Sequence, residues 1–119
     1  MGRIVVVAYR PKPGQQSALE HLMRQHHRRL LAQALVTERT PVLMRAADGT
    51  IIEVFEWVSA AAMTAAHDNP AVQQMWGEYA DVCEYVPLAQ VPEAQALFAE
   101  FEPLAVAPAA AELHPEFSP

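Results

Sequence analysis

After Arg45 the chain contains no Lys or Arg, whereas twelve of its fourteen acidic residues follow that position. All eight basic residues lie before Ala46, where only Glu20 and Glu38 oppose them, so the two parts carry formal charges of +6 and −12. Such an asymmetry indicates either a nucleic-acid-binding arm or complementary surfaces within one fold. Because the whole chain has a net charge of −6, we expect no nucleic-acid partner and favour complementary surfaces.

Cysteine is nearly absent, since Cys83 is the single one in 119 residues. No intrachain disulfide and no Cys-based zinc site can form. The sequence also holds no spaced metal-ligand set, no Gly-rich phosphate loop and no Ser nucleophile elbow. No apolar run approaches the about 20 residues of a membrane-spanning helix. We therefore expect a cytoplasmic protein without a metal site and without a membrane partner.

Hydrophobic residues make up 52% of the chain, which is enough for one folded domain with its own core. We place this domain at residues 1–102. Residues 103–119 are rich in Ala and Pro, and there we expect a C-terminal tail.

Runs of β-branched residues alternate with helical spacings of apolar residues along the domain. We expect strands at 3–9, 36–46, 51–58 and 83–90, and helices at 15–35, at 59–67, from 69 onward and at 92–102. The start of the long helix stays open, because either the turn at Gly14 or a capping box at Ser17 and Glu20 could set it. Asp48-Gly49 predicts a tight hairpin between the second and third strands.

This order, β-α-β-β-α-β followed by a C-terminal helix, predicts an α+β fold with ferredoxin-like topology. In that topology the first and third strands are central, and the second and fourth are edges. Pro41 and Pro87 fall in the two expected edge strands, where the missing N–H of proline is tolerated.

Both faces of the central strands are apolar, so both need a cover. The two main helices can cover one face only. A second copy of the chain, packed face to face as a twofold homodimer, would cover the other face and form a dimeric α+β barrel. The C-terminal helix and tail are the alternative cover.

The third strand and the helices after it carry a family pattern. The stretch reads Glu53-Val-Phe-Glu-Trp57-Val-Ser59, then an Ala-rich segment to His67, then Asn69-Pro-Ala-Val72 and Met75-Trp76. Together with the Val-rich first strand, the Pro-Gly step and the long helix, it resembles the antibiotic biosynthesis monooxygenase-type domain of the dimeric α+β barrel superfamily. The resemblance covers residues 3–90.

The resemblance implies a homodimer with a pocket between sheet and helices in each subunit. Enzymes of this family often oxygenate phenolic or quinol-like compounds without a cofactor, and others degrade haem. The haem-degrading branch places a Trp nine positions, and a haem-binding His nineteen positions, after the aromatic residue that Trp57 matches. This sequence has Ala66 and Trp76 there, so we expect no haem and no other cofactor.

Two histidines are candidate catalytic residues. His26 lies within the apolar stripe of the long helix and should face the sheet, as an acid–base group or as a satisfied core residue. His67 ends the short helix after the third strand, on the side of Met63. There it would either complement the helix C-terminus or line a pocket.

Four aromatic residues and one methionine are candidate substrate-binding residues of an apolar pocket between sheet and helices. They are Tyr9, Trp57, Met63, Trp76 and Tyr79, and each could equally be a core residue. We therefore expect a cofactor-independent monooxygenase of a small aromatic or quinol-like substrate. The alternative is a non-catalytic homodimer that binds a small apolar ligand or has a structural role only.

Two glutamates of the third strand pose a packing problem. Glu53 and Glu56 are three positions apart, so they point to opposite faces and cannot form a paired-carboxylate site. One of them must enter an apolar layer, and we expect Arg39 or Arg45 to pair with it across the hairpin.

Overall fold

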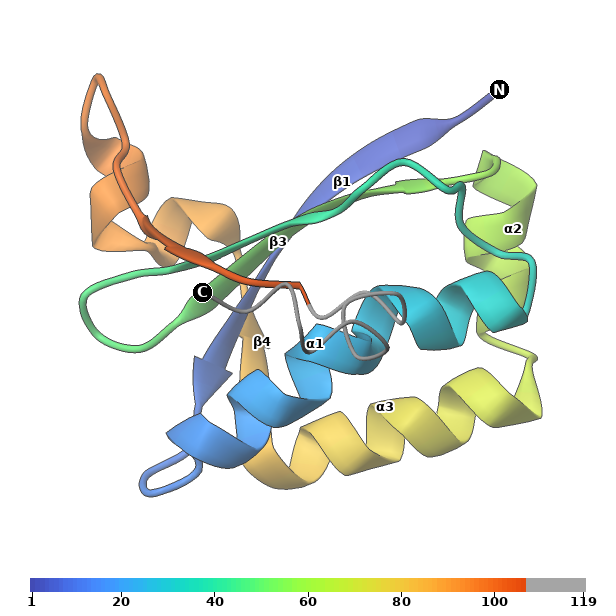
Figure 1. Cartoon of the computed structure of the whole chain (residues 1–119), viewed down its shortest axis with the longest axis horizontal. Helices are drawn as coiled ribbons and strands as arrows, with labels where there is room; N and C mark the ends of the chain where they lie inside the picture. Colours follow the sequence, from blue (N-terminus) through green and yellow to red (C-terminus); the bar gives the residue numbers. More distant parts are fainter. Residues whose placement is uncertain (107–119) are drawn as a thin grey trace, which may run out of the picture.

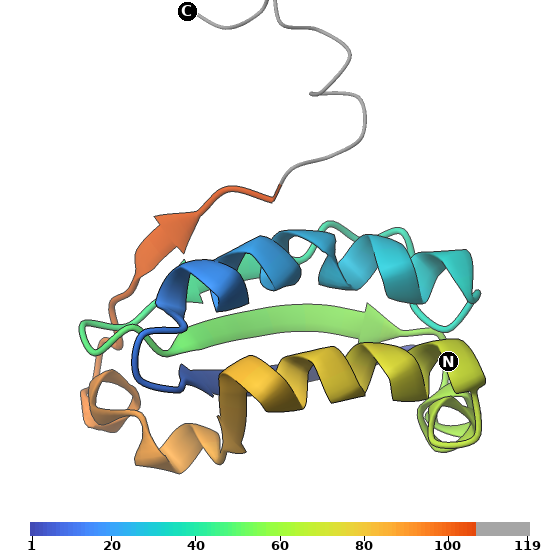
Figure 2. The same cartoon turned by 90° about the horizontal axis from the view of Figure 1, so that it is seen from below.

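A five-stranded antiparallel sheet and three α-helices make up the computed structural model, which describes residues 1–106. The elements are β1 (Arg3–Pro11), α1 (Gln16–Ala32), β2 (Val42–Arg45), β3 (Ile51–Trp57), α2 (Ala60–Ala66), α3 (Pro70–Val82), β4 (Cys83–Val86) and β5 (Glu102–Leu104). Two short 3-10 turns, Leu88–Gln90 and Pro92–Gln95, lie between β4 and β5. The helices α1 and α3 lie side by side against one face of the sheet (Figures 1 and 2). The α+β class is the one that the sequence predicts.

The strand order is β4-β1-β3-β2-β5, and all neighbouring strands are antiparallel. As predicted, β1 and β3 are central, and they pair from Arg3–Trp57 to Tyr9–Ile51. The pairing of β4 with β1 covers only Ala8 to Pro11. Within residues 1–106, the first half of β1, residues 3–7, therefore has a strand neighbour on the β3 side alone.

The predicted hairpin joins β2 to β3. The Ala46 N–H donates to the Thr50 carbonyl at 2.8 Å, and the Thr50 N–H donates to the Asp48 carboxylate at 2.9 Å. Gly49 has a φ of +92°, a conformation that side-chain-bearing residues rarely adopt. The Asp-Gly pair is thus what lets the chain reverse here.

The second and fourth strands are shorter than predicted, and neither contains its proline. Pro41 precedes β2 and Pro87 follows β4, because a residue without an N–H interrupts the ladder at these points. Before Pro41 the chain contributes only an isolated bridge between Val36 and Trp57. The prediction that β2 is an edge is also wrong, because β5 pairs with it.

The predicted C-terminal α-helix over 92–102 is wrong. Only Pro92–Gln95 is helical, as one 3-10 turn, and the chain then continues into β5 with Pro103 on the sheet edge. The expected apolar stripe is not buried, since Leu97 is 93% and Phe98 81% exposed. Within the predicted helix Ala94 and Phe101 do pack against a core, but this is too little tertiary support for so short a helix. The sheet thus reaches just past the predicted domain boundary at 102, and residues 107–119 of the predicted tail lie outside the described residues.

Two hydrophobic cores occupy the two faces of the sheet. The larger one lies between the sheet and the helices, and its most buried members include Tyr9, Leu19, Met23, Leu30, Ile51, Val72, Met75 and Tyr79. The smaller one, on the opposite face, consists of Ala8, Ala46, Ile52 and Val91, with Phe101 and others packed against it. The connection between β4 and β5 thus covers one end of the second face.

Within residues 1–106, the other end of the second face stays open. Val6, Val54 and Val42 are cross-strand neighbours on β1, β3 and β2. Val6 is 44% and Val42 51% exposed, and Ile4 is 57% exposed. These residues form an apolar row on the surface, which we call the valine row.

Ion pairs join the basic and acidic parts of the chain inside the fold. The guanidinium of Arg29 on α1 makes two contacts of 2.8 Å with the carboxylate of Glu78 on α3. Arg39 contacts Glu56 at 3.0 Å. This agrees with the complementary-surface interpretation of the charge asymmetry.

The helices begin where local signals place them. Gly14, with a φ of +78°, precedes α1, which starts without a side-chain cap, so the turn rather than the Ser17 box sets its start. Ser59 caps α2 by accepting from the Ala62 N–H. Asn69 caps α3 by accepting from two backbone N–H groups. No helix of the described part is long and apolar enough to span a membrane.

The cap of α3 gives a stability test. In Asn69→Ala the N–H groups of Ala71 and Val72 lose their acceptor, and we expect the free energy of unfolding to fall by about 1 kcal/mol. Urea titration followed by circular dichroism measures this. Asn69→Asp keeps an acceptor at a helix N-terminus and should retain most of the stability. Equal losses in both variants would contradict the capping role.

Candidate functional site

The centre of the large core contains a buried pair of ionisable side chains. His26 on α1 is 3% exposed and Glu53 on β3 is fully buried. His26 Nδ1 lies 2.8 Å from Glu53 Oε1. The pair forms because residues 19, 23, 26 and 30 line the buried face of α1, while residues 51, 53 and 55 face the helices by strand alternation.

Tyr9 completes a buried triad. Its hydroxyl donates to the same Glu53 Oε1 atom at 3.0 Å. Burial, together with the Glu53 carboxylate, raises the pKa of the Tyr9 phenol well above its usual range. Tyr9 therefore stays a neutral hydrogen-bond donor at every physiological pH.

The triad is not fully satisfied. His26 Nδ1 is at ion-pair distance from Glu53, but the pair lacks the alignment of a hydrogen bond, and Glu53 Oε2 has no hydrogen-bond partner within residues 1–106. A buried carboxylate oxygen without a partner costs free energy, which a purely structural pair would avoid. A carboxylate beside an imidazole is also an arrangement found at acid–base sites.

Aromatic rings surround the pair. The His26 ring lies 5.4 Å from that of Tyr79, 5.5 Å from that of Phe55 and 6.0 Å from that of Tyr9. The Tyr79 hydroxyl donates to the Leu22 carbonyl at 2.6 Å, which anchors this ring to α1. Side chains thus fill the space between sheet and helices at this point.

Glu53 and Glu56 point to opposite faces, as predicted, but the predicted arginine partner of the buried one is wrong. Glu53 pairs with His26 and Tyr9, because its side chain enters the helix-facing core where no arginine reaches it. Glu56 takes Arg39, at 3.0 Å, and the Thr37 hydroxyl, at 2.9 Å. Arg45 pairs with Glu20 and Glu102 instead.

The structure separates five of the seven candidate residues into two groups. Tyr9, His26 and Tyr79 lie together around Glu53, whereas His67 and Trp76 meet at the outer end of α2 with ring centroids 5.2 Å apart. His67 is exposed at the C-terminus of α2. The two candidate catalytic histidines are therefore not neighbours of one site.

The two remaining candidates pack at the margin of the large core. Trp57 is 8% exposed and its ring lies 5.5 Å from that of Phe55. Met63 is partly buried against the same core. Trp57 thus neighbours Phe55, one of the rings that enclose His26.

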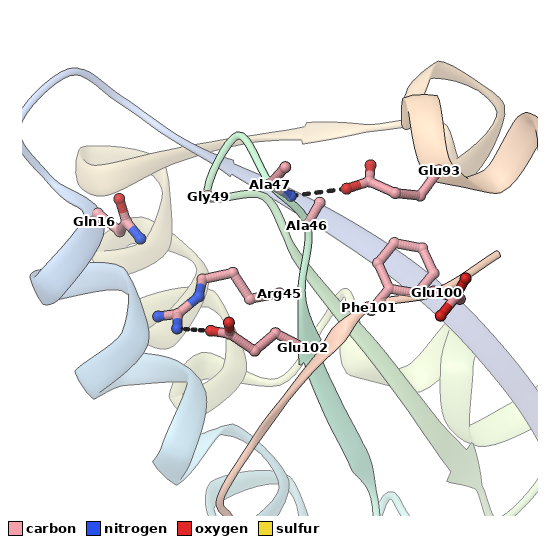
Figure 3. A pocket seen from close by; sticks show the side chains of 9 residues that line it. All are labelled: Gln16, Arg45, Ala46, Ala47, Gly49, Glu93, Glu100, Phe101 and Glu102. Carbon is pink, nitrogen blue, oxygen red and sulfur yellow. Dashed lines mark hydrogen bonds and ion pairs between the residues drawn. The ribbon is translucent and has the colours of Figure 1, made fainter.

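A cavity of about 530 Å³ opens at the far end of the sheet, where β2, its hairpin and β5 meet (Figure 3). Arg45 points toward Glu102 there, and the Ala47 N–H donates to Glu93 at 2.8 Å. Arg45 also contacts Glu20, so its charge is already compensated. This cavity contains none of the predicted site residues.

Glu53 is the residue that sequence reasoning failed to place in the site. The signal was present, because a lone carboxylate on an apolar strand face and a lone imidazole on an apolar helix stripe both require a buried partner. Their pairing depends on the register between α1 and β3, which no local pattern sets. Within residues 1–106 no three His, Cys, Asp or Glu side chains are grouped so as to hold a metal ion.

The buried pair gives a second stability test. Glu53→Ala leaves His26 and the Tyr9 hydroxyl without their partner in the core, and we expect unfolding free energy to fall by about 3 kcal/mol. Denaturant titration measures this. Glu56→Ala removes the same group from the other face of β3, where the carboxylate is partly exposed and pairs with Arg39, and should cost far less. Similar losses in the two variants would show that the buried triad contributes no more to the unfolding free energy than the surface pair of Glu56.

Comparisons of the chain with protein-family models, with curated proteins and with solved structures find no match. The resemblance to the antibiotic biosynthesis monooxygenase-type domain therefore depends on the sequence motifs alone.

Proposed function

We propose that the chain is a homodimeric α+β barrel of ferredoxin-like topology and acts as a cofactor-independent monooxygenase on a small aromatic or quinol-like substrate. The observation that carries the proposal is the buried pair, with His26 Nδ1 2.8 Å from Glu53 Oε1. A base of this kind, enclosed by aromatic rings, is what removal of a phenolic proton requires. The resemblance of the sequence to the antibiotic biosynthesis monooxygenase-type domain agrees with it.

In this proposal His26 accepts a proton from the substrate, and Glu53 stabilises the resulting imidazolium. The substrate anion is richer in electrons and reduces dioxygen directly. One oxygen atom enters the substrate and the other leaves as water, and all four electrons come from the substrate. The exclusion of water by the surrounding rings strengthens the attraction between imidazolium and carboxylate.

Entry of a substrate requires a ring to move, since Tyr79 and Phe55 pack against His26 in the closed core. This filled interior favours a second candidate, a non-catalytic homodimer that binds a small apolar ligand elsewhere or has a structural role. In that case the triad is a core feature. Only the first candidate function includes turnover of a substrate. Binding measurements alone therefore do not distinguish the two.

Oxygen uptake with a panel of quinols and phenols tests the first candidate. With an active substrate, His26→Gln should lower kcat by about 100-fold, because the proton acceptor is lost. Glu53→Gln keeps the size of the side chain but removes its charge, and should lower kcat by at least about 10-fold. Glu56→Gln makes the same change on the other face of β3 and should leave kcat unchanged.

The same assays separate the two candidates. If no compound stimulates oxygen uptake while some raise the melting temperature, the binding candidate is correct. If uptake occurs but does not respond to His26→Gln, the assigned base is wrong. Circular dichroism of each variant confirms that it is folded before its activity is compared.

The homodimer is supported by the valine row. Val6 and Val42 are about half exposed on a face of which only one end is covered by the β4–β5 connection. Burial of apolar area is worth about 25 cal/mol per Å², so a second copy of this face would gain most of its association energy from the row. A twofold axis would place the row of one copy against that of the other.

Charge placed on the valine row tests the dimer. Val42→Glu should convert a dimer into monomers at micromolar concentration, because two carboxylates would be buried near the axis. Light scattering with size-exclusion chromatography gives the mass. Leu31→Glu adds the same charge on the outer side of α1, at a residue 36% exposed, and should leave the dimer intact. A monomeric parent protein would exclude the face-to-face arrangement.

A further inference from the structure

A second cavity lies at the margin of the large core, between α3 and the edge strand β4. It has a volume of about 470 Å³ and is lined by Lys12, Trp76, Ala80, Cys83, Glu84 and Tyr85. It contains no member of the buried triad and lies on the helix side of the sheet, away from the valine row, as Cys83 belongs to the large core. Its lining residues differ from those of the cavity at Arg45.

Two aromatic side chains of this cavity each pack against a second ring. The Tyr85 ring, 51% exposed, packs edge-on against Tyr9 at 5.2 Å. The Trp76 ring packs against His67 at 5.2 Å. Each ring is therefore held in place while part of its surface is free. Planar ligands bind well against such fixed aromatic surfaces, because little side-chain entropy is lost on binding.

The remaining apolar wall is uncharged. Ala80 presents a methyl group, and Cys83 is 4% exposed. Burial raises the pKa of the Cys83 thiol to about 11, so the thiol is neutral and is not a nucleophile near pH 7. Polar selectivity must therefore come from the two charged residues at the margin of the cavity, Lys12 and Glu84.

Lys12 supplies the positive charge of the site. Its ammonium donates to the Ala80 carbonyl at 2.7 Å, which holds it at the end of α3 next to the cavity. Glu84 also lines the margin of the cavity, but it alternates with Cys83 and Tyr85 along β4, so strand geometry directs its carboxylate toward the opposite face. Arg10 is its cross-strand neighbour there. The cavity thus has a cation at its margin and aromatic walls.

We propose that this cavity binds a planar aromatic carboxylate, with its ring against Trp76 and Tyr85 and its carboxylate on Lys12 Nζ. The ammonium has further N–H groups besides the one given to Ala80, and these suit a carboxylate. The proposal does not depend on oxygenation or on His26, because it concerns binding alone at a separate cavity.

Three naphthalene probes with different charges test it by isothermal titration calorimetry on the full chain at low salt. They are naphthalene-2-carboxylate, the neutral naphthalen-2-ylmethanol and the cationic naphthalen-2-ylmethylammonium. The carboxylate should bind at least about 10-fold more tightly than the cation. Lys12→Gln should weaken the carboxylate by about 10-fold and leave the alcohol unchanged, while Lys12→Arg should stay within about threefold of the parent.

Two more variants locate the site. Tyr85→Ser removes an exposed ring and should weaken both the carboxylate and the alcohol. Arg10→Gln removes a nearby cation from the other sheet face and should have no effect. Lys12 and Tyr85 are exposed, so these variants should fold, which circular dichroism verifies. Equal binding of all three probes, equal effects of Lys12→Gln and Arg10→Gln, or no binding of the carboxylate at millimolar concentration would overturn the proposal.

Discussion

The burial of one carboxylate, that of Glu53, is the constraint on which the rest of this structure depends. Glu53 lies at the middle of β3, the third of the five strands in the sheet order, in a layer that is otherwise apolar. Such a group is tolerated only where partners approach it from other elements. Tyr9 from β1 and His26 from α1 provide them, so three separate elements must be in register for the core to form.

The rings around this group follow from the same constraint. Tyr79 and Phe55 enclose His26 at 5.4 and 5.5 Å, and the Tyr79 hydroxyl is anchored on the backbone of α1. Arg29 and Glu78 then fix α1 to α3 at the surface. The polar contacts thus determine how the helices sit on the sheet, while the apolar side chains supply the driving force.

Sequence patterns predicted most of this fold because the relevant signals are local. Asp48-Gly49 set the hairpin, Ser59 and Asn69 set helix starts, and the Val-rich run of β1 marked a central strand. The failures came where tertiary contacts decide. The segment after Pro92 has a helical spacing of apolar residues, yet Leu97 and Phe98 are exposed, and the chain runs irregularly to β5 instead of forming a helix.

The candidate site was predictable in part for the same reason. The burial of His26 follows from its place on the α1 stripe, and Tyr9 and Tyr79 were assigned to the same layer. Their connection through Glu53 needed the register of α1 against β3, which depends on contacts far apart in sequence. His67 does not lie with them, because α2 is a short helix that ends at the surface. Periodicity shows which side of a helix a residue is on, but not how far the end of the helix lies from the core.

In the described part of the chain, the short pairing of β4 with β1 leaves one side of the first half of β1 without a strand partner, next to exposed Ile4 and Val6. A strand of this kind is a template for the strands of other chains, and natural proteins blunt such edges with charge or proline. Arg3 at the start of β1 and Pro87 at the end of β4 stand at the two limits of this edge. A charged residue and a proline are the two residue types that commonly protect such an edge from pairing with another chain.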